Sequence, residues 1–482
     1  MLAACGGAAA ALVLEDRRAQ TAAIVVALVA APVLVLGNVW DEPRIVDFRS
    51  SPSHVAAALA VGALLLAGLV ALFRRYPDGL AIAAFAVLPL RVPLDIGGET
   101  ANLLVPLYLV IAAGVVARAI DRRPPEQGRR WPDEGEDPWP RRLRWVLAAV
   151  LVLYALQGSY SEDVPNAIEN IGFFLAPFAV LFVLLAELEW SGRLLGRVLI
   201  VVTAVASISA AIAVYQYFAR DLFLNPELFD ANELHPYFRA NSLFFDPNIL
   251  GRHLALAITA LAAYIAWASS RRELALASLA AGLCLVGLSF SYSITSFAAL
   301  LAGLGMIALL RWGLRGAALA AGFGVIGLAV LLIAGGTPTS DIETDRSIDS
   351  GHADLVQGGL DLARDRPVAG FGSGSFGRAF YDRIEHARTT VSHSEPITVA
   401  AEQGAIGLVV YLGLLVTALV TMLGRGARRS VGRTAAAACF VVLLIDSLGY
   451  TGFATDPAMW ALLGLGVALR FDPPGDSATI RA

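Results

Sequence analysis

A histidine stands directly before one of the apolar stretches of the chain. His393 lies three residues ahead of the apolar run 396–423. An imidazole changes its charge near neutral pH, so His393 could accept a proton from a reacting hydroxyl. In a structural interpretation, His393 is simply a polar residue near a helix N-terminus.

All positive charge on this chain comes from arginine. The sequence has 482 residues and 36 basic ones, and no lysine is among them. A Walker A loop ends in Gly-Lys-Ser or Gly-Lys-Thr, so this loop is excluded, as are Schiff-base chemistry and a lysine general base. GC-rich codon usage would also explain the missing lysine. In either case, any phosphate must be held by guanidinium groups.

Arg239 precedes another transition from polar to apolar sequence. The segment Asp246-Pro247-Asn248 leads into the apolar run 248–268, and Asp246 or Asn248 is suited to cap a helix there. A fixed guanidinium can hold a phosphate through two parallel hydrogen bonds. Phosphate binding and a structural ion pair both remain open for Arg239.

A glycine-rich stretch lies between these two regions. Residues 370–376 read Gly-Phe-Gly-Ser-Gly-Ser-Phe, which predicts a sharp turn. No predicted strand precedes it, so a dinucleotide-binding loop is disfavoured. Apolar spacing over 353–365 predicts a short amphipathic helix before the turn.

The composition indicates that the chain is a membrane protein, whose helices must position the segments described above. Hydrophobic residues make up 57% of the chain and charged residues 16%, whereas soluble domains are less apolar and more charged. The net charge of −4 gives no indication of nucleic-acid binding, and the three cysteines lack metal or redox spacing. We expect an all-α, polytopic helix bundle with about 13–14 spans of roughly 20 residues. The runs are 19–40, 53–73, 79–97, 101–118, 143–158, 169–187, 196–217, 248–268, 273–290, 294–310, 316–334, 396–423, 434–450 and 457–470, with 1–14 left unassigned.

Arginine predicts the orientation, because it crowds the cytoplasmic side of membrane proteins. If the loop 118–144, which holds eight arginines, is cytoplasmic, every second loop lies on that side, and 24 of the 36 arginines lie there. The long loops 218–247 and 335–395 then face outward, where cytoplasmic cosubstrates such as ATP are not available. The predicted organisation is membrane helices 1–120, a cytoplasmic linker 121–142, central helices 143–334 with the outer loop 218–247, a large outer loop 335–395, helices 396–470 and a cytoplasmic tail 471–482.

Several of these segments together resemble the O-antigen ligase and O-antigen polymerase family. His393-Ser394, nine residues and then Gly404-Ala405-Ile406-Gly407 is similar to the family's His-Asn/Ser signature followed by Gly-x-x-Gly. Residues 366–376 resemble its Pro-Leu-x-Gly-x-Gly turn, and 239–248 resemble its arginine, aromatic and Pro-Asn entry to a helix. Residues 88–93 resemble part of its N-terminal half.

The chain also departs from the family pattern. Members commonly carry Ser-x-Ser-Arg between two central helices, whereas residues 291–295 read Ser-Tyr-Ser-Ile-Thr. Members often have an arginine early in the large loop, where this chain has His352. Arg346, Arg364 or Arg378 would have to compensate for these losses.

The resemblance implies a membrane glycosyltransferase of the GT-C type in the cytoplasmic (inner) membrane. Such an enzyme moves a glycan from an undecaprenyl-diphosphate carrier to an acceptor hydroxyl on a glycan or lipid, at the outer face of that membrane. It implies His393 as the catalytic base, Glu402 as its orienting partner, and no metal or cofactor. Other polysaccharide-assembly membrane proteins are further candidate partners. The implied substrate-binding residues are Arg239, Arg220, Arg91, Arg346, Arg378, His352 and Asn248.

Two other readings remain open. A different GT-C enzyme could use Asp41 or Glu42, which the predicted topology places in the first outer loop. A transporter or flippase would need charge within its spans, and Asp446 is the candidate for that role unless a buried partner neutralises it. The sequence leaves ligation and polymerisation open, and identifies neither the sugar nor the acceptor.

Overall fold

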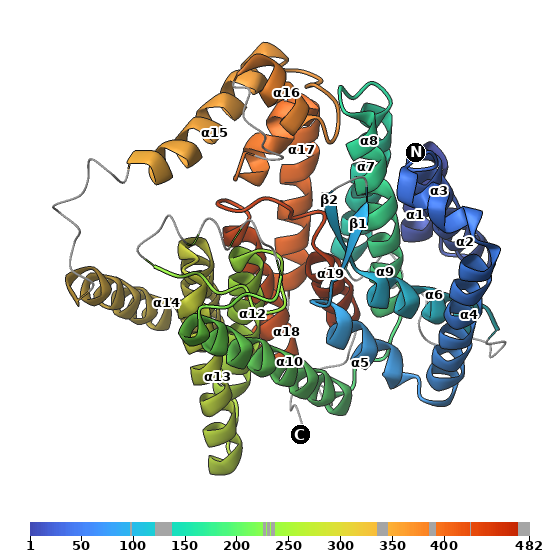
Figure 1. The fold of residues 1–482 in the computed structure, drawn as a ribbon. Helices are drawn as coiled ribbons and strands as arrows, with labels where there is room; N and C mark the ends of the chain where they lie inside the picture. The colour runs from blue at the N-terminus through green and yellow to red at the C-terminus, as the bar shows by residue number, and fades with distance from the viewer. Residues whose placement is uncertain are drawn as a thin grey trace.

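The apolar runs of the sequence form helices in the computed structural model, which describes residues 1–96, 99–120, 137–224, 228, 232, 237–334, 346–384, 392–424 and 426–470 (Figure 1). This confirms an all-α polytopic bundle. Eight helical segments are long and apolar enough to cross a membrane. They are α2 (Arg17–Asn38), α4 (Pro52–Arg75), the continuous α8 (Val164–Glu169), η1 (Asn170–Leu175) and α9 (Ala176–Ala186), α10 (Gly192–Ala219), α12 (Pro247–Ile265), α13 (Arg271–Ser291), α14 (Ile294–Ala334) and α17 (Glu395–Leu423).

Other helices, which do not meet the length and hydropathy expected of a span, complete the bundle among the described residues. They are α1 (Leu2–Val13), α3 (Pro43–Ser50), α5 (Asp78–Val87), α6 (Val105–Ile120), α7 (Trp139–Gly158), α15 (Arg346–Asp365), α16 (Phe376–Arg383), the short η2 (Ala427–Arg429), α18 (Val431–Asp446) and α19 (Pro457–Arg470). The predicted amphipathic helix 353–365 is thus the second half of α15. The expected linker 121–142 lies largely outside the described residues, as do 335–345 and the tail 471–482.

The unassigned N-terminal stretch is a buried helix. α1 packs against α2, α7 and α9, and its Cys5, Ala8 and Leu12 are fully buried. The contact with α2 is backbone to backbone, because a Cβ added to Gly7 would lie 2.8 Å from the Ala27 nitrogen. Small residues permit this approach, which is how helices associate tightly in membranes.

The predicted span 79–97 is wrong in its second half. α5 ends at Val87, and the chain then forms an antiparallel hairpin of β1 (Val92–Ile96) and β2 (Glu99–Leu103). Pro89 and Pro93 explain the difference, because proline removes a backbone donor and disfavours helix in the residue before it. Apolar composition alone does not reveal this exit from the helix. The runs 294–310 and 316–334 form one element, α14, which has a break at Gly313.

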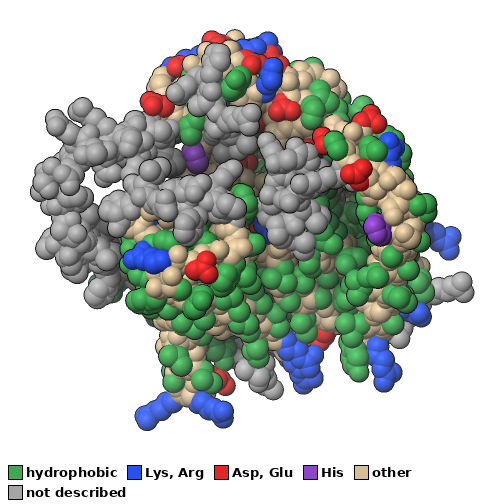
Figure 2. All heavy atoms as spheres, viewed as in Figure 1, with side chains coloured by type: hydrophobic (Ala, Val, Ile, Leu, Met, Phe, Trp, Pro, Cys, Tyr) green, Lys and Arg blue, Asp and Glu red, His purple; other side chains and the backbone are tan. Residues whose placement is uncertain are grey.

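The polar contacts fall into two sets at opposite ends of the bundle. At the end nearer α15 and α16, Arg383 pairs with Glu162, and Asn166 donates to the Gly374 carbonyl. At the other end, Arg118 pairs with Glu187. In each contact, both residues come from segments that the distribution of arginines predicts to lie on the same side of the membrane. Figure 2 shows basic side chains gathered along the lower edge of a broad hydrophobic surface, which is the end predicted to face the cytoplasm.

Candidate functional site

Arg239 is held by one edge of its guanidinium. Its Nε donates to the Ser291 carbonyl at 3.0 Å, and its Nη2 donates to Asn248 Oδ1 at 3.1 Å. An arginine side chain has five N–H donors. No protein partner is shown for the other three among the described residues. An arginine fixed on one side and open on the other is suited to hold an anion in a defined position.

The backbone around Arg239 is fixed by three other parts of the chain. The Asn232 side chain accepts from the Arg239 N–H and donates to its carbonyl. The Ala240 N–H donates to the Phe290 carbonyl. Ser242, two residues after Ala240, has a left-handed φ of 53°. The Gln216 side chain accepts from the Ser242 N–H and donates to its carbonyl. Sequence reasoning missed Asn232 and Gln216, because side-chain amides in polar loops and helix ends carry no distinctive signal.

Asp246 and Asn248 have separate tasks. The Asp246 carboxylate accepts from the Asn248 N–H at 2.6 Å and caps α12, as one of the two sequence interpretations expected. Asn248 instead turns its side-chain oxygen to Arg239. Asn248 was predicted to bind substrate, and in the structure its side chain holds Arg239 in position.

His393 occupies a strained turn directly before α17. Its φ is 59°, a left-handed value that is uncommon for a non-glycine residue. The turn is fixed beneath it by the buried Ser392, whose hydroxyl donates to the Ser394 carbonyl at 2.8 Å and lies 2.9 Å from the Thr398 hydroxyl. His393 itself is half-buried. Such strain persists only where surrounding contacts impose it, and it is concentrated at functional sites.

Glu402 lies about two turns into α17 and binds the glycine-rich turn. Its carboxylate accepts from the Gly374 N–H at 2.7 Å and from the Phe376 N–H at 3.1 Å. Both oxygens therefore have backbone partners. This geometry favours a role for Glu402 in shaping the turn.

The glycine-rich turn in its turn supplies backbone hydrogen-bond partners at a break in α17. Gly404 has φ 63° and ψ −162°, which interrupts the helical hydrogen bonds. The Phe371 and Gly372 N–H groups donate to the carbonyls of Ala401 and Glu402, and the Pro367 carbonyl accepts from the Ala405 N–H. The backbones approach so closely that glycine is required, since a Cβ on Gly404 would lie 2.4 Å from the Val368 carbonyl carbon. The glycine spacing noted in the sequence therefore has a structural cause.

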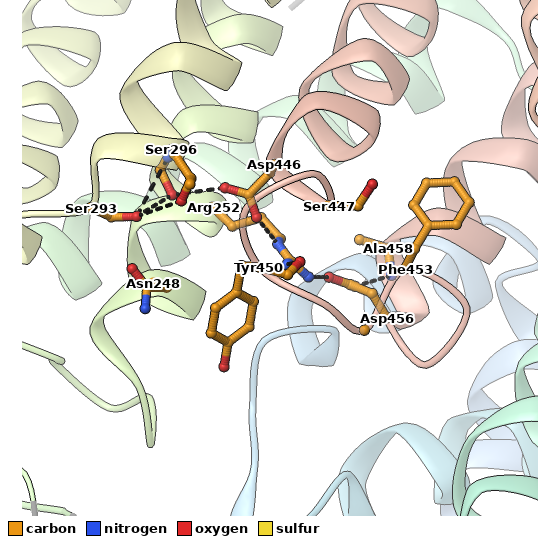
Figure 3. A network of polar contacts seen from close by, with 12 residues as sticks. Asn248, Arg252, Ser293, Ser296, Asp446, Ser447, Tyr450, Phe453, Asp456 and Ala458 are labelled. Atoms are coloured by element: carbon orange, nitrogen blue, oxygen red, sulfur yellow. Dashed lines mark hydrogen bonds and ion pairs between the residues drawn. The ribbon is translucent and has the colours of Figure 1, made fainter. Parts of the chain in front are cut away.

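A buried charge network lies beneath the Arg239 segment, and it contains the buried partner that the sequence analysis left open for Asp446. Arg252 bonds Asp446 at 2.5 Å and Asp456 at 2.8 Å, and the Ser296 hydroxyl donates to Asp446 at 3.0 Å (Figure 3). Arg252 and Asp446 are 7% and 0% exposed, so each charge is neutralised by the other. The acid considered for transport therefore has a structural partner.

Tyr450 connects this network to the residues before α12. Arg252 donates to the Tyr450 carbonyl at 3.2 Å, and its guanidinium lies 5.2 Å from the tyrosine ring. Burial raises the pKa of Tyr450 well above that of an ordinary phenol, and the Asp246 carboxylate raises it further, while the charges of Arg252 and Arg91 oppose this. Arg91, a predicted binding residue, thus lies within electrostatic reach of Tyr450.

The loop between α18 and α19 joins the two halves of the site. The Glu395 N–H donates to the Ser447 carbonyl, and its carboxylate accepts from the N–H groups of Gly452 and Phe453. Glu395 is two residues from His393, so the loop that carries Tyr450 also fixes the histidine turn. The structure thereby ties Arg239 and His393, 154 positions apart in the sequence, to one loop at one end of the bundle.

The remaining predicted residues lie around this core or outside it. Arg220 is exposed at the end of α10, 4.8 Å from the Tyr217 ring and 5.2 Å from the Phe238 ring. Arg364 and Arg378 are exposed and pair with Asp361 and Asp382 on their own helices. Arg346 and His352 lie in α15, and their side chains are outside the described part of the structure.

The rival acids lie in the turn between α2 and α3. Asp41 is exposed there and Glu42 is half-buried. No hydrogen bond or ion pair joins either side chain to the Arg239 or His393 segments among the described residues. The geometry therefore gives these two acids less support than His393.

Comparison with known proteins identifies one matching family. Residues 279–412 match the family model described as O-antigen ligase. This range runs from the middle of α13 into α17 and includes the His393 turn and the Gly404 break. No curated protein sequence matches the chain. The match confirms the resemblance drawn from the His393, Gly404 and glycine-turn motifs.

Proposed function

We propose that this multi-pass membrane protein moves a glycan from undecaprenyl diphosphate to an acceptor hydroxyl at the outer face of the cytoplasmic membrane. The match of residues 279–412 to the O-antigen ligase family model supports this proposal. The C-terminus would then lie in the cytoplasm.

The proposed roles follow from the two halves of the site. The acceptor oxygen attacks the anomeric carbon of the donor sugar, and the bond from that carbon to the diphosphate oxygen breaks. The diphosphate leaves with the bonding electron pair, and the open N–H groups of Arg239 stabilise its negative charge. His393 accepts the proton of the acceptor hydroxyl.

The observation that carries the proposal is the half-anchored guanidinium of Arg239. Its bonds to Ser291 and Asn248 fix its orientation before any ligand binds, so little ordering is needed when an anion arrives. Arg220, whose guanidinium lies 5.2 Å from the ring of the neighbouring Phe238, is a further positive charge close by. Guanidinium groups alone can neutralise the negative charge of the diphosphate, so the proposed mechanism has no step through a metal.

The test is glycan transfer in proteoliposomes that contain the purified protein, an undecaprenyl-diphosphate oligosaccharide and an acceptor glycan. Release of undecaprenyl diphosphate is the readout. We expect His393→Asn to lower the rate by roughly 100-fold or more, because asparagine tolerates the left-handed backbone but is not a base near pH 7. Arg239→Lys should lower it by about 100-fold, since lysine keeps the charge and loses the forked geometry.

Arg197→Lys serves as the matched control. Arg197 is an exposed arginine of α10 that pairs with Asp78, and no binding role is proposed for it. This variant should transfer at the wild-type rate. Folded His393→Asn and Arg239→Lys proteins that also transfer at the wild-type rate would refute the proposed roles.

A further inference from the structure

An aromatic cluster lies beside the Arg239 anchor. The rings of Tyr237 and Tyr292 stack with centroids 4.8 Å apart and an interplanar angle of 21°. A second stack joins Tyr217 to Phe290 at 4.0 Å and 11°. These residues come from the end of α10, the segment before α12 and the end of α13. We call the pair Tyr237 and Tyr292 the tyrosine platform.

The platform is attached to the arginine site through adjacent residues. Tyr292 follows Ser291, whose carbonyl accepts from Arg239 Nε, and Tyr237 lies two residues before Arg239. Arg239 and the two rings are therefore held on one small piece of structure.

Packing in the core does not explain the conformation of Tyr292. It caps α13 with a φ of 51°, a position that glycine or asparagine usually fills. Its side chain is nonetheless 40% exposed. A large ring in a strained turn, with one face against Tyr237 and much of its surface open, is suited to contact a ligand.

The chemistry of the donor indicates which part of it would reach this surface. In the proposed function, a sugar is bonded directly to the diphosphate that Arg239 holds, so a pyranose ring must lie within a few ångströms of the guanidinium. The face of a pyranose with equatorial hydroxyls consists of C–H groups. These are attracted to the electron-rich face of an aromatic ring, while the phenol hydroxyls can bond the sugar hydroxyls.

We propose that the tyrosine platform is a sugar-binding subsite, where the open face of Tyr292, supported by Tyr237, stacks on a pyranose of the donor glycan close to the diphosphate. This inference rests on the proposed function and adds a residue that distinguishes a glycosylated carrier from a bare one. Arg239 recognises the diphosphate, and the platform recognises the sugar.

The experiment compares two ligands in lipid nanodiscs that contain the full chain. One is undecaprenyl diphosphate, and the other is undecaprenyl diphosphate that carries a single N-acetylglucosamine. We expect the wild type to bind the glycosylated carrier about five- to tenfold more tightly. Tyr292→Asn, which suits the left-handed backbone, should lose this preference and keep the affinity for the bare carrier. Tyr292→Phe keeps the ring and should keep most of the preference.

Tyr215→Leu is the control for a general membrane-surface effect. Tyr215 is 56% exposed on α10 and stacks on Phe223, outside the platform. We expect it to bind both carriers as the wild type does. A Tyr292→Asn protein that retains the wild-type preference would overturn the subsite and leave the proposed function standing. A wild type that binds neither carrier would overturn both.

Discussion

The Glu402 carboxylate accepts a hydrogen bond from the Gly374 N–H at 2.7 Å, across 28 residues of sequence. This bond, with the one from Phe376, fastens the glycine-rich turn to the broken helix α17. The turn in turn supplies backbone partners to the break at Gly404. The Glu402 carboxylate therefore has a defined structural role, which is to hold the glycine-rich turn against α17. The family resemblance had implied that it orients His393.

We expect Glu402→Gln to destabilise the protein by about 1–3 kcal/mol, because a neutral amide has only one acceptor oxygen for two buried N–H donors. Thermal unfolding of the purified protein measures this. Asp382→Asn, which breaks an exposed pair with Arg378, should change stability by no more than ~0.5 kcal/mol. If Glu402→Gln unfolds like the wild type but loses glycan transfer, Glu402 acts in the reaction instead.

Replacing His393 should separate stability from activity. His393→Gly relieves a left-handed backbone that costs an L-residue about 1 kcal/mol, although glycine also increases the entropy of the unfolded chain. We expect unfolding at the wild-type temperature or above, together with loss of transfer. A marked loss of stability would show that the imidazole holds the turn and would argue for a structural histidine.

The Arg252 network should respond asymmetrically to substitution. Arg252→Met leaves Asp446 buried without its main partner, and we expect a loss of roughly 3–5 kcal/mol. Adding Asp446→Asn to that variant should recover part of it, because the buried charge is removed. The measurement is the unfolding midpoint of single and double variants. Additive losses would mean that the two residues act independently.

The departure from the family's Ser-x-Ser-Arg pattern suggests a gain of function. Ile294 stands at the position of the missing arginine, begins α14 and is 84% exposed. We expect Ile294→Arg to tighten binding of undecaprenyl diphosphate several-fold in a salt-dependent manner, with stability changed by less than about 0.5 kcal/mol. Ile294→Gln is the uncharged control, and equal affinities for the two variants would contradict an electrostatic effect.

The sequence by itself determined the membrane class, most helix positions and the residue types available for chemistry. Apolar runs and the arginines between them are local features, and a helix in lipid satisfies its own backbone, so composition is sufficient to predict it. His393 before α17 and Asp246 at the start of α12 were found for the same reason, since helix ends have local signals. The hairpin after α5 was missed because apolar content does not distinguish a strand from a helix in a short run.

Only the tertiary structure decided which polar groups meet. Arg252 and Asp446 are 194 residues apart, and the loop that fixes the Glu395 end of the His393 turn also contacts the Arg252 network beneath Arg239. Glu402, for which the sequence suggested a contact with His393, accepts hydrogen bonds from the Gly374 and Phe376 N–H groups. A buried carboxylate bonds whichever donors the packing brings within about 3 Å, and spacing along the chain does not encode that choice.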